Sequence, residues 1–251
     1  MPEYKINPGI IRESLNELKI IQSWIKNIGI NPENPQIILI GGWAVDAYNS
    51  WYGSVDIDII TTSDIRNDLK YYLRKKHGYL ESRRELQMPS GIEKNTDYGK
   101  IIIDFIPKGL NQPFEGQDIP FHFSITEGNV TLKSIRNTCS MYIPTRTILI
   151  FLKLKAAWDR NFRVENNSSN DPDWDRSKLI KDYADILALL DPKSSGYETN
   201  LDKLGDLFDK YPFLLQTLFK IQYSREALER YGRLEKPEIK HIFDHLDNYF
   251  R

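Results

Sequence analysis

The chain has 251 residues, of which 40% are hydrophobic and 12% aromatic, so it can fill the core of one large domain or of two small ones. A formal net charge of −1 provides no global electrostatic field that would favour nucleic acid or a membrane surface. A single cysteine, no N-terminal signal pattern and no apolar run near the ~20 residues that span a bilayer favour a soluble cytoplasmic protein without a membrane partner.

Apolar residues recur at helical spacing between residues 9 and 28, which predicts a helix that ends near Gly29. A turn rich in Pro and Asn then leads into a β-branched run, 36–40, that is typical of a buried strand. Gly41-Gly42 ends this strand. The stretch WAVDAYNSWY predicts a short helix, and residues 54–60 form the second predicted strand.

The middle of the chain alternates between polar helical and apolar strand patterns. A helix is predicted over 64–76, capped by Ser63 or Asp64 and ended by Gly78. The other predicted elements are strands at 79–87, 100–106, 121–125 and 130–135, with loops at 88–99 and 110–120.

From residue 145 onward the pattern is helical. Helices are predicted at 147–163, 178–190, 201–209, 212–231 and 237–249, and the polar segment 163–177 is predicted to be an exposed loop. The predicted fold class is therefore α+β, with a mixed sheet and flanking helices over residues 1–144 and a helical domain over 145–251.

The stretch SVDIDII places two carboxylates inside an apolar strand. Residues i and i+2 share a face, so Asp56 and Asp58 point one way while Val55, Ile57 and Ile59 point the other. Two adjacent carboxylates repel each other, and a divalent cation such as Mg²⁺ or Mn²⁺ removes that penalty. A solvated pair on an exposed sheet face is the alternative for this motif taken alone.

A third acid, Asp104, lies within the apolar run IIIDFI. If the two strands are neighbours, three carboxylates converge on one patch, as metal-assisted phosphoryl or nucleotidyl transfer requires. Gly41-Gly42 adds a strand-to-helix turn whose backbone N–H groups can approach a triphosphate, with Ser54 as a hydroxyl donor at its rim. The combination favours a functional site more strongly than any single motif does.

The residues Gly41, Gly42, Asp56, Asp58 and Asp104 give the chain a resemblance to the nucleotidyltransferase superfamily of the DNA polymerase β type. The GGWAVD start resembles aminoglycoside and lincosamide adenylyltransferases. The spacing from Gly-Gly to S-x-D-x-D resembles the AbiEii-type abortive-infection toxins more closely. So do KLKAAWDR, 153–160, and KDYADI, 181–186. Two features depart from the family pattern, namely the insertion 163–177 and the N-terminal helix.

The resemblance implies transfer of a nucleotide from an NTP with release of pyrophosphate, on a nucleotidyltransferase-type mixed sheet. Asp56 and Asp58 would hold the metal ions, and Asp104 would complete the metal site and serve as the base. The residues implied to bind the nucleotide are Gly41, Gly42, Ser54, Lys155, Lys153 as second choice, and Asp182, with Asp185 less certain. The alternatives are a solvated helix face for the lysines, and a helix N-terminal acid and a surface charge for Asp182 and Asp185.

The favoured function is thus a metal-dependent nucleotidyltransferase, AbiEii-like, possibly a toxin that acts on RNA such as a tRNA end and has a cognate antitoxin. We expect NTP and acceptor in a cleft between the two halves. The first alternative keeps the chemistry but transfers to a small molecule or a protein. The second is an NTP-binding module that does not turn over. The sequence identifies neither the preferred base nor the oligomeric state.

Three other features are weaker. His241 and His245 have zinc-compatible spacing, but the Glu of a metalloprotease helix and a third ligand are missing. Cys139 is predicted to be a small core residue. A basic segment is either a solvated surface or a phosphate-tracking RNA surface with tyrosines that stack or pack; its members are Arg66, Lys70, Arg74, Lys75, Lys76, Arg83 and Arg84, with Tyr71, Tyr72 and Tyr79 among them.

Overall fold

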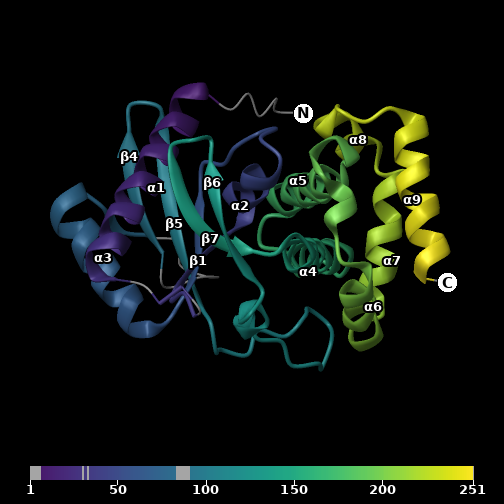
Figure 1. The fold of residues 1–251 in the computed structure, drawn as a ribbon, viewed down its shortest axis with the longest axis horizontal. Helices are drawn as coiled ribbons and strands as arrows, with labels where there is room; N and C mark the ends of the chain where they lie inside the picture. The colour runs from purple at the N-terminus through teal and green to yellow at the C-terminus, as the bar shows by residue number, and fades with distance from the viewer. Residues whose placement is uncertain (1–6, 30, 33, 83–90, 251) are drawn as a thin grey trace. The chain divides into compact units, whose positions relative to one another are not determined.

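The structure is a computed structural model, and it describes residues 7–29, 31–32, 34–82 and 91–250. The chain forms two compact units (Figure 1). The first unit consists of Met1–Leu110 with His122–Pro144, and the second of Asn111–Phe121 with Thr145–Arg251. Among the described helices, none is both long and apolar enough to cross a membrane.

The first unit contains three α-helices, one 3₁₀ helix and two sheets within the described residues. The helices are α1 (Pro8–Ile28), α2 (Gly41–Tyr48), α3 (Ser63–His77) and η1 (Phe123–Thr126). The strands are β1 (Ile37–Ile40), β2 (Ile57–Thr61), β3 (Leu80–Glu81), β4 (Ile92–Thr96), β5 (Gly99–Pro107), β6 (Val130–Ile135) and β7 (Cys139–Pro144).

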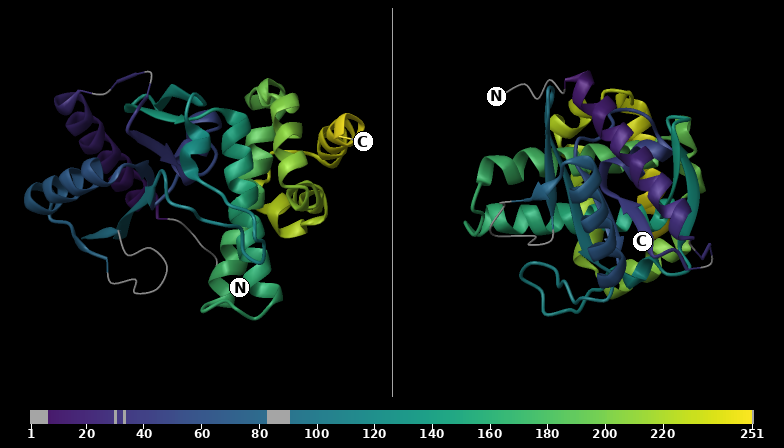
Figure 2. Two further views of the ribbon diagram at one scale, coloured as in Figure 1. Left: turned by 90° about the horizontal axis from the view of Figure 1, so that it is seen from below. Right: turned by 90° about the vertical axis from the view of Figure 1, so that its left-hand side faces the viewer.

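Helix α1 begins where its sequence supplies a cap and a proline. The Asn7 side chain accepts a hydrogen bond from the backbone N–H of Gly9, and Pro8 occupies the first turn, where no N–H is needed. Its apolar stripe is buried, and Trp24 lies 6.3 Å, between ring centroids, from Tyr72 of α3. Helices α1 and α3 therefore lie side by side (Figure 2).

The main sheet has the order β1-β2-β5-β4-β3 and is mixed. β2 pairs antiparallel with β1 and parallel with β5, while β4 pairs antiparallel with β5 and with β3. The two neighbouring strands β2 and β5 are apolar over residues 57–60 and 101–106 except at Asp58 and Asp104. A strand buried on both faces needs such continuous apolar runs.

Strands β6 and β7 form a separate hairpin. Its turn contains Arg136 and Asn137, both with positive φ, at 47° and 53°. Two consecutive residues with φ above zero match the right-handed twist of the flanking strands, which is why this kind of turn closes hairpins.

Every regular element in the described part of the second unit is a helix, and Asn111–Phe121 joins these helices as a loop. Its α-helices are α4 (Arg146–Glu165), α5 (Pro172–Leu190), α6 (Leu201–Lys210), α7 (Phe213–Lys220), α8 (Arg225–Tyr231) and α9 (Lys236–Phe250). Short 3₁₀ turns are η2 (Pro192–Ser194), η3 (Gly196–Glu198) and η4 (Ile221–Tyr223). Helices α4 and α5 pack against each other at the centre, since both are buried over most of their length.

Residues 111–121 belong to the second unit although they precede it in the sequence. Phe114 lies 5.5 Å from Phe121 and 5.1 Å from Phe213, and Phe121 lies 5.8 Å from Phe151, measured between ring centroids. This aromatic cluster anchors the loop to helices α4 and α7. The loop 111–121 therefore groups with the helices that follow Pro144 rather than with its neighbours in sequence.

The predicted fold class, α+β with a mixed sheet followed by helices, is confirmed. The N-terminal helix, the strands at 37–40, 99–107 and 130–135, and the end of α3 at Gly78 also agree with the prediction. The predicted cap of α3 is wrong, because the N-cap is Thr62 and its side chain makes no capping hydrogen bond.

Several predicted elements are corrected. Residues 121–125 form no strand, since 123–126 is a 3₁₀ helix. The strand predicted at 79–87 covers only Leu80–Glu81, and 83–90 lie outside the described residues. Strand β4 falls in a predicted loop, because it is mostly polar, and β7 was not predicted. The helix predicted over 212–231 is interrupted where Ser224 caps a new helix, α8.

The segment 163–177, predicted to be an exposed loop, is helical from Pro172 onward. Asp171 caps this helix by accepting from the Trp174 N–H. Asp175 is buried and accepts from Arg163 at 2.7 and 3.0 Å and from the Ser169 hydroxyl at 2.8 Å. Arg163 and Asp175 thus pair α4 with α5, whereas residues 166–171 are a mostly exposed loop, as predicted.

This pairing predicts a specific loss of stability in acid. Burial alone would raise the pKa of Asp175, but hydrogen bonds from Arg163 and Ser169 outweigh it and hold that pKa below its ordinary value. The ion pair therefore contributes fully above the unfolded-state pKa of about 3.9 and is lost as pH falls through the folded-state value. We expect Asp175→Asn to cost about 2 kcal/mol of unfolding free energy at pH 7 and less at pH 3.

Urea denaturation of wild type and variant at pH 7, 5, 4 and 3 measures this difference. A cost that stays the same down to pH 3 would contradict the assignment of the pair as the source of stability.

Candidate functional site

Two of the predicted acids face each other on neighbouring strands. Asp58 of β2 and Asp104 of β5 are register partners in the parallel pairing, so their side chains point to the same face about 5 Å apart. Both are half-buried, while their strand neighbours Ile57, Ile59 and Ile103 are buried. The predicted convergence required the two acid-bearing strands to be neighbours, and β2 and β5 are neighbours.

Asp56 lies just before β2, because the strand begins at Ile57 rather than at the predicted residue 54. It is half-buried, like Asp58. Within the described ranges, no three His, Cys, Asp or Glu side chains are already gathered closely enough to hold a metal ion. A metal site made of Asp56, Asp58 and Asp104 stays a prediction.

Glycines lie against both paired acids. Gly41 has φ +70°, and a Cβ added to it would overlap the carboxylate of Asp58. A Cβ added to Gly91 would lie 2.7 Å from Oδ1 of Asp104. Only glycine permits this positive φ and this close approach without strain. Backbone rather than side chains therefore borders the two carboxylates on these sides.

The predicted strand-to-helix turn is the first turn of α2 itself. The helix begins at Gly41, with Ile40 as its N-cap and no side-chain capping hydrogen bond. Helix N-termini offer backbone N–H groups and a partial positive charge to anions. Gly42 lies in this first turn and is buried, and Ser54 is buried in the connection from α2 to β2.

Gly41→Ala tests the close approach. We expect it to cost more than the 1–2 kcal/mol that an L-residue pays at a left-handed φ, because its methyl group also displaces Asp58. Gly78→Ala is the matched control, since Gly78 has φ +73° and nothing within 4 Å of an added Cβ. Chemical denaturation gives both costs. Equal costs for the two variants would argue against the contact with Asp58.

The lysines and acids predicted from the helical motifs are buried in the second unit. Lys153 lies between α4 and α5, with Nζ 3.0 Å from Asp182 Oδ1 and 2.7 Å from Asp185 Oδ2. Lys181 also contacts Asp185, at 2.9 Å, and Arg160 contacts Asp182. Three alternatives are therefore wrong: a solvated helix face for Lys153, a helix N-terminal acid for Asp182 and a surface charge for Asp185. All three side chains are buried, and Asp182 lies in the middle of α5.

Electrostatics in this cluster follow from burial and pairing. Burial lowers the pKa of Lys153, but Asp185 and Asp182 outweigh that effect and raise it above its ordinary value. Burial likewise opposes the charge of Asp185, yet Lys153 and Lys181 hold its pKa below the ordinary value. Burial lowers the pKa of Lys181. Asp182 and Asp185 are thus paired carboxylates, and the sequence did not single out Arg160 and Lys181 as their partners.

Lys155 has a different environment from Lys153. Its Nζ lies 2.6 Å from Asp159 Oδ2 and 3.4 Å from the carbonyl of Pro113. It also lies 5.0 and 5.3 Å from the ring centroids of Phe114 and Phe121. The alternative of a solvated helix face is wrong here too, since Lys155 is buried against the aromatic cluster.

The basic segment divides into paired and exposed residues. Lys70 and Arg74 each contact Glu81 at 2.9 Å, and Arg83 and Arg84 lie outside the described residues. Tyr79 is core, whereas Tyr71 is 66% exposed with Lys75 beside its ring. These contacts leave both interpretations of the segment open.

In the part of the chain that the structure describes, the two histidines and the cysteine noted in the sequence lie in environments that indicate no site. His241 and His245 are exposed on α9, and within the described residues no third ligand joins them. Cys139 is buried in β7, as predicted, and burial raises the pKa of its thiol to about 11.

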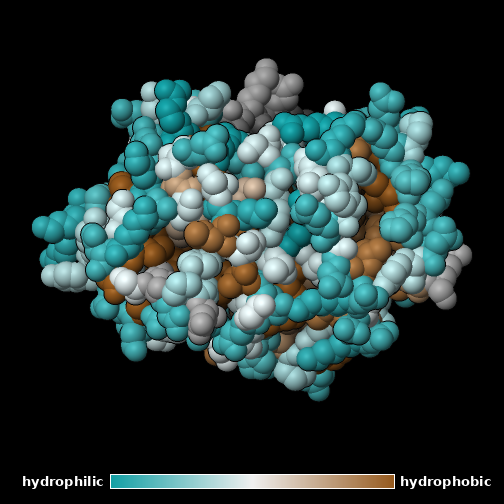
Figure 3. All heavy atoms as spheres, in the orientation of Figure 1, coloured by the Kyte–Doolittle hydropathy of each residue, from teal (hydrophilic) through white to brown (hydrophobic). Residues whose placement is uncertain are grey.

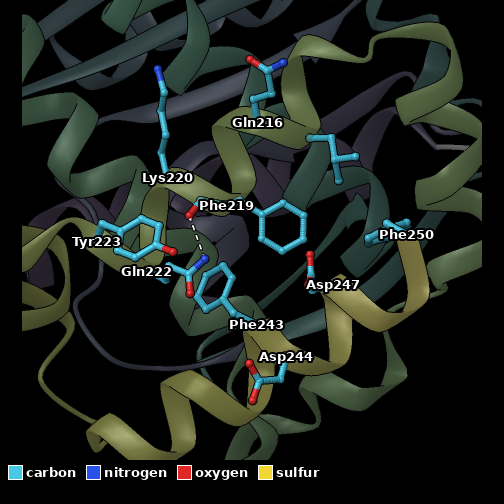
Figure 4. A pocket seen from close by; sticks show the side chains of 10 residues that line it. Gln216, Phe219, Lys220, Gln222, Tyr223, Phe243, Asp244, Asp247 and Phe250 are labelled. Carbon is cyan, nitrogen blue, oxygen red and sulfur yellow. Dashed lines mark hydrogen bonds between the residues drawn. The ribbon is translucent and has the colours of Figure 1, made fainter.

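A pocket of about 580 Å³ lies among α7, η4 and α9 (Figure 4). Its walls are Phe219, Phe243 and Phe250 together with polar groups such as Lys220 and Asp244. Apolar atoms show at the surface between α7 and α9 (Figure 3). None of the residues that line this pocket is a predicted site residue.

No protein-family model and no curated protein matches the chain. Among solved structures, the chain is similar to the STING-associated CdnE c-di-GMP synthase from Capnocytophaga granulosa. The two are 11% identical, with 97% of this chain and 81% of that chain covered and a TM-score of 0.27. The assignment of a function therefore rests on this chain's own residues and their geometry.

Proposed function

We propose that this protein is a metal-dependent nucleotidyltransferase that transfers a nucleotide from an NTP to an acceptor hydroxyl and releases pyrophosphate. One observation carries the proposal. Asp58 and Asp104 are register partners on parallel strands, and the first residue of a helix, Gly41, packs directly against Asp58. Two carboxylates thus lie beside a helix N-terminus suited to phosphate.

The donor set fits Mg²⁺ or Mn²⁺. Carboxylate oxygens are the ligands that these hard cations prefer. Glycine at positions 41 and 91 lets the backbone lie directly against the carboxylates, since an added Cβ would overlap Asp58 and press on Asp104. Asp58 and Asp104, with Asp56 before the strand, would hold the metal. When bound, it would neutralise charge on the attacking and leaving oxygens.

Residues of the chain would bind the triphosphate and accept the proton. Backbone N–H groups at Gly41 and Gly42 would orient the triphosphate, with the Ser54 hydroxyl nearby. Asp104 would accept the proton of the attacking hydroxyl. Lys155, Lys153 and Asp182 are the second-unit residues proposed to meet the nucleotide. The existing ion pairs of both lysines would have to open for this, so we assign phosphate contact first to the start of α2.

The finer assignment is an AbiEii-like enzyme with RNA, such as a tRNA end, as acceptor and a cognate antitoxin as partner. It rests on the sequence resemblance of 153–160 and 181–186. The exposed Tyr71 and Lys75 are compatible with an RNA acceptor. A small-molecule or protein acceptor and an inactive NTP-binding module are the alternatives.

Label transfer tests the proposal. Purified protein is incubated with each α-labelled NTP, Mg²⁺ or Mn²⁺, and total RNA, beside a lane without RNA. Label on a tRNA-sized band supports the RNA acceptor, and label on the protein supports protein modification. The transferase proposal would be overturned if the protein bound NTP but neither labelled any acceptor nor released pyrophosphate. The acceptors tested for this are RNA, protein and small hydroxyl compounds.

A further inference from the structure

A buried carboxylate in α2 is held by an arginine from the β6–β7 hairpin. Arg136 donates from Nε to Asp46 Oδ2 and from Nη2 to Asp46 Oδ1, each at 2.8 Å. The Asp46 side chain is 1% exposed and that of Arg136 is 33% exposed. Hydrogen bonding to Asp46 raises the pKa of Arg136. A bidentate charge-assisted pair of this kind fixes both partners in one geometry.

Asp46 also fixes the loop that leads to the candidate site, through both its carboxylate and its backbone carbonyl. The backbone N–H of Gly53 donates to Asp46 Oδ1 at 2.9 Å, and the Ser50 hydroxyl donates to the Asp46 carbonyl at 3.1 Å. Gly53 has φ +79°, and a Cβ there would lie 3.1 Å from Nη2 of Arg136. The loop between α2 and β2 is therefore tied down three residues before Asp56.

An aromatic ring completes the arrangement. The Arg136 guanidinium lies 5.6 Å from the ring centroid of Trp43, which is fully buried. The indole N–H of Trp43 donates to the hydroxyl of Ser14 in α1 at 2.9 Å. Trp43 and Asp46, both in the stretch GGWAVD, thus hold Arg136. Gly41, the first residue of that stretch, packs against Asp58.

We propose that Arg136 is a positioning residue for nucleotide transfer: through Asp46 it holds the loop 49–56, and hence Asp56 and Asp58, in register with Gly41-Gly42. This inference rests on the proposed function. Helix α2 is pinned at both ends, by Gly41 against Asp58 and by Asp46 against Gly53. Without Arg136 the second attachment loses its counter-charge, and the acids are free to shift relative to the phosphate-binding turn. A shift of about 1 Å at a reacting centre can cost about 100-fold in rate.

Arg136→Ala tests this directly, with Lys133→Ala as the matched control, because Lys133 is a cation of the same hairpin whose Nζ lies over the Tyr48 ring. We expect Arg136→Ala to lower kcat about 10- to 100-fold. It should raise the Mg²⁺ concentration for half-maximal activity several-fold and change KM for NTP less than kcat. Added guanidinium should restore part of the activity, and Arg136→Lys should retain more than Arg136→Ala.

Chymotrypsin cleavage after Trp51 or Tyr52 reports the loop independently of activity. These rings stack with centroids 4.9 Å apart within the tethered loop. We expect cleavage there to be faster in Arg136→Ala than in wild type or Lys133→Ala. Unchanged cleavage, or faster cleavage with unchanged kcat and Mg²⁺ dependence, would overturn the positioning role. A wild-type protein without transferase activity would instead overturn the proposed function on which the role rests.

Discussion

Replacing Asp58 by Asn is expected to lower nucleotide transfer at least about 10³-fold while the first unit stays folded. Charge stabilisation by a bound metal is worth several kcal/mol, and each ~1.4 kcal/mol corresponds to a factor of ten in rate. The amide keeps the shape of the side chain but loses its charge. Because Asp58 and Asp104 are like charges in register, the melting temperature should be unchanged or higher.

The measurement is label transfer under saturating NTP, together with thermal unfolding. Asp68→Asn is the matched control, since Asp68 is an exposed acid on α3 of the same unit. Asp56→Asn and Asp104→Asn should behave as Asp58→Asn does. Wild-type activity in any of these three variants would remove that residue from the proposed metal site.

Asp185→Asn is expected to lower the unfolding free energy by about 3–5 kcal/mol, the cost of breaking a buried ion pair from one side. Ion pairs join three cations, Lys153, Lys181 and Arg160, to two carboxylates, Asp182 and Asp185. Removing Asp185, whose side chain is 1% exposed, leaves three cations with one carboxylate.

The same charge balance predicts an asymmetry. Lys153→Met should cost less than Asp185→Asn, because each carboxylate then keeps one cation, Lys181 or Arg160. Asp244→Asn is the surface control, since its pair with Lys240 is exposed at 3.6 Å, and it should cost under about 0.5 kcal/mol. Denaturant unfolding gives all three values. A larger cost for Lys153→Met than for Asp185→Asn would refute this description of the cluster.

The sequence was a good guide wherever the signal is local. Helical spacing, the Gly29 and Gly78 boundaries and the apolar runs of β1 and β5 each follow from residues a few positions apart. The alternation in SVDIDII correctly separates Asp58 from the buried Ile57 and Ile59. Strand β4, by contrast, is polar enough to pass for a loop and exists because β5 offers it a hydrogen-bonding edge.

By itself, therefore, the sequence determined the α+β class and the place of Asp58 and Asp104 in strands, though not that Asp56 precedes its strand, because periodicity and turn chemistry act between neighbours in the chain. Only the tertiary structure decided which residues meet. The pairing of Asp58 with Asp104, the capture of Asp46 by Arg136 and the burial of Lys153 all join residues distant in sequence. Strand pairing and desolvation select these partners, since a buried charge must find an opposite charge wherever the fold supplies one.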